Sequence, residues 1–364
     1  MKSLYIAISF AMVFACEQAN SQGCVAVRST GGACMMQSHD SMARGWQLTT
    51  SMRYFRSYKH FRGSHEEKNR VQENSEVINH QASMDITLVR NFNSRWSMAV
   101  NLPVLSNARS SKYEHYGNAS TSPDARRSTH SFGIGDMRII GYYWLINPSK
   151  AHRGNIQAGL GLKLPTGDYR VMDHFYKSDG SVQLGPVDQS IQLGDGGTGF
   201  TGELNGYYNL SPVVSVYGNV YYLINPREHN GVSTARGGAT SASSITNGSD
   251  VMSVPDQYMF RAGGSFSFNK FSASIGARME CIPVHDLVGG SNGFRRPGYI
   301  ISAEPGVSYQ FHKFSTFVTI PFALERNRTQ SVPDRITTAR TGVFTQGDAA
   351  FADYLVNVGV NIRF

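Results

Sequence analysis

The chain has 364 residues, a net charge of +8 at pH 7 and a hydrophobic fraction of only 40%, with 37 glycines, 20 phenylalanines and 18 tyrosines spread throughout. The body of the chain holds no run of the ~18 apolar residues that a membrane helix needs, so a helical membrane protein is excluded. The basic residues are not grouped around a recognisable recognition element, which argues against nucleic-acid binding.

The first apolar run lies at the N-terminus, where Lys2 precedes the stretch 4–15 and small polar residues follow. This run is too short to span a membrane, and the pattern predicts a cleaved secretory signal of residues 1–21, with cleavage after Ser21. Cleavage of a lipoprotein before Cys16 is the alternative, which Phe14 disfavours.

Residues 22–44 form a short segment between the signal and the first strand. We expect it to plug a lumen or to stay in the periplasm as a partner site, and a disordered leader is the alternative. Cys24 and Cys34 are candidates for a disulfide in an oxidising compartment, whereas Cys281 lies inside a strand pattern.

From residue 45 onward the hydrophobic period is two. In "NIQAGLGLKLP", Ile156, Leu160 and their even-numbered neighbours alternate with polar residues and glycines, as in a strand with one apolar and one wet face. The same alternation recurs around Val216 and Val358.

This pattern predicts twelve strands joined by five tight turns and six long loops. Their ranges are 45–57, 82–92, 95–105, 131–146, 155–165, 199–209, 213–225, 257–268, 271–283, 298–311, 314–326 and 351–364. Short turns on one side and long loops on the other are typical of bacterial outer-membrane barrels, and closure removes edges that lipid cannot satisfy. We therefore predict an all-β fold, a transmembrane antiparallel up-and-down β-barrel over residues 45–364, with both termini periplasmic.

Aromatic residues crowd the tight-turn ends of the predicted strands, as expected for an interfacial girdle. The girdle candidates are Trp96, Tyr143, Trp144, Phe268, Phe271, Phe311, Phe314 and Phe364. Prolines lie toward the other end, and Pro103 and Pro321 come early enough in their strands to suggest local bulges.

Two stretches, "FGIGDMRIIGYYW" and "GLGLKLPTGDY", resemble the outer-membrane barrels grouped as the phenol-degradation MetA-pathway family. The later "DLVGGSNGFRRPGY" and "GDAAFADYLVNVGV" are similar to segments of a subgroup of exported barrels. The resemblance covers most of the chain from about residue 45 and implies a barrel for solute passage, with no catalytic residues to carry over. It also implies that the terminal Phe364 is read by the barrel-assembly machinery.

The predicted inward positions carry charges of both signs. The candidates for lining and selectivity are Arg53, Asp85, Asp136, Arg138, Lys163, Glu203, Arg261, Arg278, Glu280, Glu304, Glu325 and Asp353. They would line a narrow pore and set its selectivity, or pair across the lumen as ordinary filling; both interpretations stay open.

Loop residues add two further hypotheses. Arginines in or beside the last two long loops would favour anionic solutes or the phosphates of lipopolysaccharide, unless they form only a solvated surface: Arg295, Arg296, Arg326, Arg328, Arg335 and Arg340. The third long loop holds oxygen ligands that would suit calcium, although turn formation explains them better: Asp168, Asp173, Asp179, Asp188 and Asp195.

Acyl hydrolysis by a lipid-acting barrel needs a serine beside a histidine, but the adjacent His130 and Ser131 would point to opposite faces of a strand. We therefore expect no enzymatic activity, no cofactor and no metal. The function predicted is an outer-membrane channel for passive or facilitated passage of small solutes, aromatic or anionic. The alternative is a closed structural or assembly-partner barrel without flux.

Overall fold

The barrel wall consists of strands in which buried and exposed side chains alternate strictly. The computed structural model describes residues 44–364, so the signal over 1–21, the segment 22–43 and the proposed Cys24–Cys34 pair lie outside the described residues. In strand β4 (Trp96–Ser111) every odd-numbered residue is buried, while every even-numbered residue is exposed or half-buried. Because side chains in a strand alternate between faces, such a strand has one face inside the barrel and one outside.

The strands close into one antiparallel barrel. In order around the wall they are β1 (Gly45–Arg62), β3 (Ile78–Asn91), β4, β5 (Arg127–Ile134) with β6 (Met137–Trp144), β7 (Gly154–Leu164), β10 (Gly199–Asn209), β11 (Val214–Ile224), β14 (Gln257–Phe268), β15 (Phe271–Ile282), β16 (Gly298–Gln310), β17 (Phe314–Thr319) with β18 (Phe322–Arg328), and β19 (Ala349–Arg363). Pairing of β1 with β19, from Gln47 opposite Arg363 to Phe61 opposite Ala349, closes the ring. The predicted twelve-stranded barrel is therefore confirmed.

Two of the twelve predicted strands are interrupted. The strand predicted at 131–146 breaks at Gly135 and Asp136 into β5 and β6, both of which pair with β4. The strand predicted at 314–326 breaks at Pro321 into β17 and β18, which both lie between β16 and β19. Proline has no N–H to donate to the ladder, which explains the second break.

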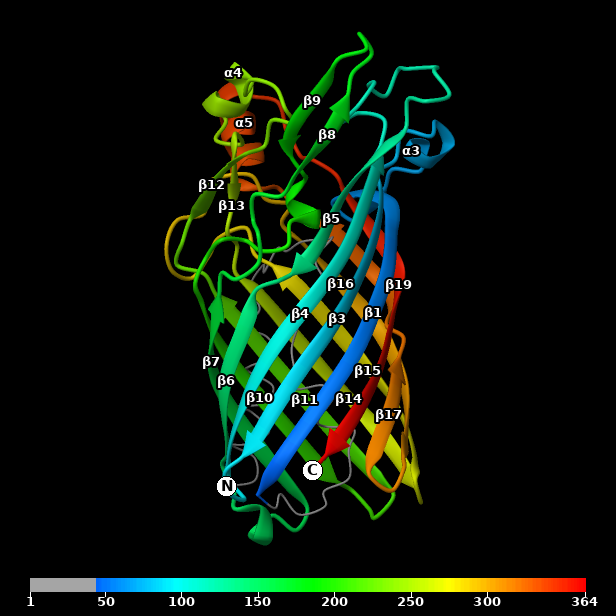
Figure 1. Cartoon of the computed structure of the whole chain (residues 1–364), viewed down its shortest axis with the longest axis vertical. Helices are drawn as coiled ribbons and strands as arrows, with labels where there is room; N and C mark the ends of the chain where they lie inside the picture. The colour runs from blue at the N-terminus through cyan, green and yellow to red at the C-terminus, as the bar shows by residue number, and fades with distance from the viewer. Residues whose placement is uncertain (1–43) are drawn as a thin grey trace.

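Short turns and long loops lie at opposite ends of the barrel (Figure 1). One end carries the tight turns, one of which holds the 3-10 turn η1 (Pro148–Lys150), together with both ends of the described chain. The loops of the other end contain β2 (His65–Glu66), α3 (Asn69–Gln72), β8 (Met172–Tyr176), β9 (Val182–Pro186), η2 (Gln189–Ile191), β12 (His229–Ser233), α4 (Ala242–Thr246), β13 (Val251–Ser253) and α5 (Val332–Thr341). This segregation by length is the predicted one.

The outer face of the wall is apolar. Leu160 is 77% exposed, and Ile156, Val216 and Val358 are 40 to 47% exposed, so the aliphatic rows predicted to meet lipid do lie on the outside. From Tyr258 to Phe268, β14 runs about 34 Å along the strand, or roughly 25 Å along an axis tilted by ~40°, which matches the apolar band of outer-membrane barrels. Within residues 44–364, no helix has the length and apolar character needed to cross a bilayer.

Aromatic side chains ring the short-turn end on the outside. The Trp96 and Tyr143 rings lie 4.5 Å apart and the stacked Phe311 and Phe314 rings 4.4 Å apart, measured between centroids. Trp96, Phe268, Phe271, Phe311, Phe314 and Phe364 are exposed, as a girdle requires. The girdle prediction is wrong for Trp144, which is 8% exposed, because neighbours in β6 face opposite sides and Tyr143 takes the outer one.

Inward aromatic rings cover glycines of neighbouring strands and narrow the lumen. A Cβ at Gly359 would lie 2.3 Å from the Phe317 ring, and one at Gly159 would lie 2.6 Å from the Tyr142 ring. Covering glycine with a ring from the next strand fills the space that a missing side chain leaves. The interior is therefore partly filled by side chains, as expected for a barrel of this size.

Candidate solute pathway through the barrel

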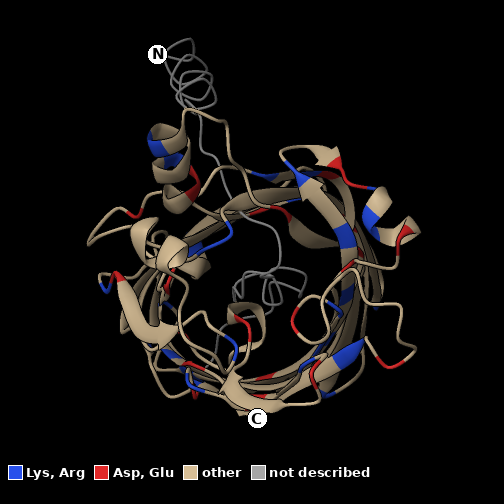
Figure 2. Cartoon of the chain, turned by 90° about the horizontal axis from the view of Figure 1, so that it is seen from above, with Lys and Arg blue, Asp and Glu red and all other residues tan. Residues whose placement is uncertain are grey.

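Basic and acidic residues both occur around the wall of the barrel (Figure 2), and many of their side chains are buried. Arg261 lies 2.7 Å from Glu304, Arg278 lies 2.8 Å from Glu280, and in both pairs the side chains are almost inaccessible. Buried ions need such partners, so these four residues serve at least as filling that holds strands β14, β15 and β16 together.

Most other predicted lining residues also face inward. Arg53 and Asp85 lie 3.8 Å apart on β1 and β3. Arg138 and Glu203 are buried at inward positions of β6 and β10, and the Tyr142 hydroxyl donates a hydrogen bond of 2.9 Å to Glu203. Near the loops, Asp353 binds Lys59 at 2.9 Å and Arg326 at 2.7 Å.

The prediction that Glu325 lines the lumen is wrong, because this residue lies on the outer face of the wall. A register shift between Ile301 and Ser302 places Glu325 opposite Ile301, an outward residue, and its carboxylate accepts a hydrogen bond from the Tyr299 hydroxyl. The next residue, Arg326, turns inward instead. The bulge moves the inward position by one residue, a change that no sequence period reports.

Part of the third long loop folds into the barrel. This inner segment, residues 187–196, includes the short turn η2 with the fully buried Ile191. The Ile191 carbonyl accepts hydrogen bonds from Ser131 at 2.5 Å and from Asn107 at 3.4 Å. The Ser190 carbonyl accepts another from Gln81 at 2.8 Å. Side chains of β3, β4 and β5 therefore hold this segment against the inner wall.

Lys163 anchors the far end of the inner segment. Its ammonium group contacts the Asp195 carboxylate and lies 3.8 Å from Asp136. Asp136 also accepts backbone hydrogen bonds from Gly167 at 3.0 Å and Asp195 at 3.1 Å. The break between β5 and β6 thus supplies the carboxylate that receives the returning loop.

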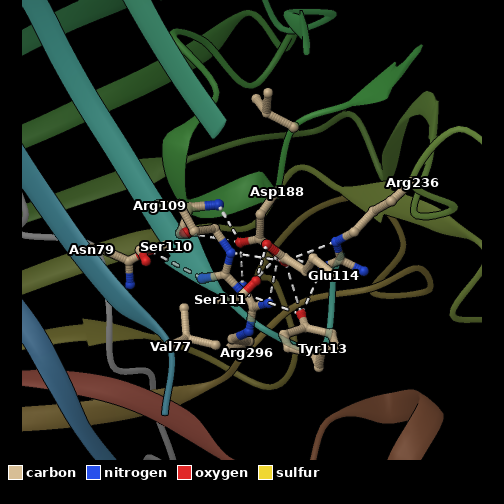
Figure 3. A network of polar contacts seen from close by, with 12 residues as sticks. Val77, Asn79, Arg109, Ser110, Ser111, Tyr113, Glu114, Asp188, Arg236 and Arg296 are labelled. Atoms are coloured by element: carbon tan, nitrogen blue, oxygen red, sulfur yellow. Dashed lines mark hydrogen bonds and ion pairs between the residues drawn. The ribbon is translucent and has the colours of Figure 1, made fainter. Parts of the chain in front are cut away.

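The near end of the inner segment is held by five charged residues that we call the arginine lock: Arg109, Glu114, Asp188, Arg236 and Arg296 (Figure 3). Asp188 lies 2.7 Å from Arg296, 2.8 Å from Arg236 and 3.5 Å from Arg109. Glu114 lies 2.9 Å from Arg109 and 2.8 Å from Arg236. Since these residues come from β4 and four different loop segments, the lock joins the loops across the mouth of the barrel.

Both carboxylates of the lock are ionised despite complete burial. Burial opposes ionisation of Asp188, but Arg109 and Arg296 overcome it and hold the pKa of that carboxyl well below its usual range. Burial also opposes ionisation of Glu114, and Arg109 with Arg236 lowers its pKa. The lock therefore stays charged at neutral pH.

A cavity of about 150 Å³ lies between the inner segment and the wall. Its walls include Gln189 and Ser190 of the inner segment and Asn107 of β4. The charged residues that line it are Arg53, Asp136, Arg138, Lys163, Asp195 and Arg296. Four predicted lining residues, the loop residue Asp195 and one member of the lock, Arg296, thus surround a polar space large enough for a small solute.

Sequence reasoning missed the lock. It ended the second strand of the hairpin at residue 105, but β4 continues to Ser111, which places Arg109 on the inward face. The available signal was the polar odd-numbered series beyond residue 105, namely Asn107, Arg109 and Ser111. Asp188 was assigned to a turn, and it does cap η2 by accepting a hydrogen bond from the Ser190 N–H at 3.0 Å.

The loop arginines are mostly committed to ion pairs. Arg295 binds Asp286 at 2.6 Å with both side chains inaccessible, and Arg328 binds Asp334 at 3.1 Å. Arg296 and Arg326 are paired as described above. The hypothesis of a solvated or anion-binding loop surface is therefore wrong for these four residues, whereas Arg335 and Arg340 contact His285 and Asn247 at exposed positions.

The calcium and esterase hypotheses gain no geometric support. Within the described residues, no group of three or more acidic, histidine or cysteine side chains is placed to hold a metal ion. His130 is exposed on the outer face, while the buried Ser131 binds the inner segment. The two residues cannot act on one substrate because they face opposite sides of the wall.

Comparison with known proteins supports the fold. No protein-family model and no curated protein matches the chain. The structure of an outer-membrane channel from Pseudomonas putida F1 is 12% identical in sequence, with a TM-score of 0.56. The alignment covers 90% of this chain and 99% of the channel's chain. A FadL homologue from Pseudomonas aeruginosa and the toluene transporter TbuX from Ralstonia pickettii are 8% and 10% identical. They cover 94% of this chain and 99% and 97% of their own, with TM-scores of 0.43 and 0.40. The closed antiparallel barrel and the similarity to the Pseudomonas putida channel together show that the chain has the fold of an outer-membrane β-barrel.

Proposed function

We propose that the protein is an outer-membrane channel for small solutes, with its short turns facing the periplasm. The observation that carries this proposal is the inner segment, a loop folded into the lumen and held over a polar cavity. A barrel that served only as a scaffold would need no such internal constriction. The similarity to the Pseudomonas putida channel supports the fold on which the proposal rests.

In this proposal the inner segment sets the conductance, and the arginine lock sets the position of the inner segment. Charges that line the cavity would bias the passage of ions, as rings of charge do in other pores. Small solutes are expected because the cavity holds about 150 Å³ and the aromatic rings over glycine narrow the lumen further.

A second function rests on a specific observation. Tyr142, Tyr217 and Phe317 fill the interior over Gly159, Gly263 and Gly359, which suits a closed barrel that acts as a structural or assembly partner. The predicted recognition of Phe364 by the assembly machinery stays a prediction and fits either function.

Single-channel recording in planar bilayers distinguishes the two functions. Folded protein is inserted, and current is recorded for the wild type and for Asp188→Ala, which removes the carboxylate shared by three arginines. Ohmic steps that grow in the variant support the channel. Silence from both proteins, with the folded form verified by its heat-modifiable mobility on gels, supports the closed barrel.

A further inference from the structure

Three basic residues interrupt the apolar outer face at its loop end. Arg56 on β1, His80 on β3 and His130 on β5 are exposed at outward positions. Each lies next to an outward apolar or aromatic stretch of its own strand, with Tyr54 two residues before Arg56 and Phe132 two residues after His130. The side chains thus lie where the apolar band of the wall ends.

Strand pairing places these three residues in a single row. Arg56 lies opposite His80, His80 opposite Ala108, and Ala108 opposite His130. With strands ~4.8 Å apart, Arg56 and His80 are neighbours and His130 lies roughly 10 Å further along the row. We call Arg56, His80 and His130 the basic row.

Arg56 is available for a ligand on the outside of the barrel. Its guanidinium stacks over the Tyr58 ring at 4.5 Å, and within residues 44–364 no carboxylate forms an ion pair with it. The His80 Nδ1 atom contacts the Tyr54 hydroxyl at 2.8 Å, which orients the imidazole. The acid that faces the row is Asp173, whose carboxylate lies 3.7 Å from His130 Nδ1.

We propose that the basic row binds the phosphate groups of lipopolysaccharide in the outer leaflet. This inference rests on the membrane orientation given under the proposed function, but not on solute passage. Guanidinium groups bind phosphate through paired N–H donors, and an imidazole N–H supplies a further donor. Apolar residues directly below the row would contact acyl chains, so the surface matches a lipid with a phosphorylated headgroup. Four of the six loop arginines, Arg295, Arg296, Arg326 and Arg328, are paired with carboxylates of the protein, so the row on the wall is the better candidate for this role.

The test measures binding of bis-phosphorylated lipid A to barrel refolded without lipopolysaccharide, in detergent micelles. We expect Arg56→Gln to weaken binding roughly fivefold, the effect of one arginine at a charged lipid surface. Arg56→Lys should retain most of the binding because it keeps the charge. Arg90→Gln is the matched control, since Arg90 also lies on the outside but at the girdle end, over the Trp46 ring at 5.0 Å.

Two further ligands identify the source of the phosphate. Dephosphorylated lipid A should bind the wild type and Arg56→Gln equally and weakly, and millimolar inorganic phosphate should not displace lipid A. Equal binding of both lipids by the wild type, displacement by inorganic phosphate, or equal losses in Arg56→Gln and Arg90→Gln would overturn the proposal. Conductance of the same variants should match the wild type, so a failure here is separable from a failure of the channel.

Discussion

The Arg296 guanidinium donates two hydrogen bonds to the Asp188 carboxylate, at 2.8 and 2.7 Å, across 108 residues of sequence. This pair joins the inner segment to the loop before β16. Because both side chains are nearly inaccessible, loss of Asp188 would remove the carboxylate that pairs with the buried Arg296 guanidinium. The position of the constriction therefore depends on a contact between two loops.

Removing the Asp188 carboxylate should release the inner segment. Loss of one partner of a buried ion pair typically costs about 3–5 kcal/mol, enough to displace a loop that is held mainly by polar contacts. We expect Asp188→Ala to give larger and more variable conductance steps while the barrel still folds. Asp179→Asn is the control, because Asp179 lies exposed in the turn between β8 and β9 and bonds only locally to Ser181. Equal conductance in all three proteins would contradict this role of Asp188.

The arginine lock should not release the inner segment between neutrality and about pH 5. The pKa values of Asp188 and Glu114 are lower in the folded protein than in an unfolded chain, so their stabilisation is present above the unfolded values near 4. It is lost only as the pH falls through the folded values. Recording between pH 8 and pH 3 checks this, and opening at pH 6 to 7 would show that another group controls the loop.

Glu304 should influence both stability and ion selectivity. It lies 2.7 Å from Arg261 and 4.0 Å from Arg278, so Glu304→Gln leaves excess positive charge inside the barrel. We expect a lower unfolding temperature and a reversal potential shifted toward anions in a salt gradient. Glu325→Gln makes the same chemical change on the outer face and should leave selectivity unaltered. Equal shifts in both variants would mean that the lumen charge does not act on permeating ions.

Gly359 should tolerate no side chain. A Cβ there would lie 2.3 Å from the Phe317 ring, and overpacking of this kind costs about 1–3 kcal/mol. Gly359→Ala should therefore lower the temperature at which the folded band is lost on gels. Gly202→Ala is the matched control, since nothing lies within 4 Å of a Cβ at that outward position. The packing argument fails if both variants melt together.

The sequence determined the wall of this protein. A barrel in lipid exposes apolar side chains on its outside and encloses polar ones, the reverse of a water-soluble protein. Each strand therefore repeats one alternation of apolar and polar residues along its whole length. Ile156, Leu160, Val216 and Val358 were placed correctly because a period of two is a local property of the chain. The segregation of short turns from long loops followed from the same local signals.

Only the tertiary structure decided the site. The bulge opposite Glu325 and the outward turn of Tyr143 rather than Trp144 depend on register between strands, which a single strand does not encode. The arginine lock depends on contacts such as Arg109 with Asp188, between segments far apart in sequence. The sequence suggests that charged loop residues are exposed to solvent. They are buried in the structure because other loops, distant in sequence, pack against them. Pairing across the barrel therefore fixes which charges are locked, which line the cavity and which remain on the outer wall.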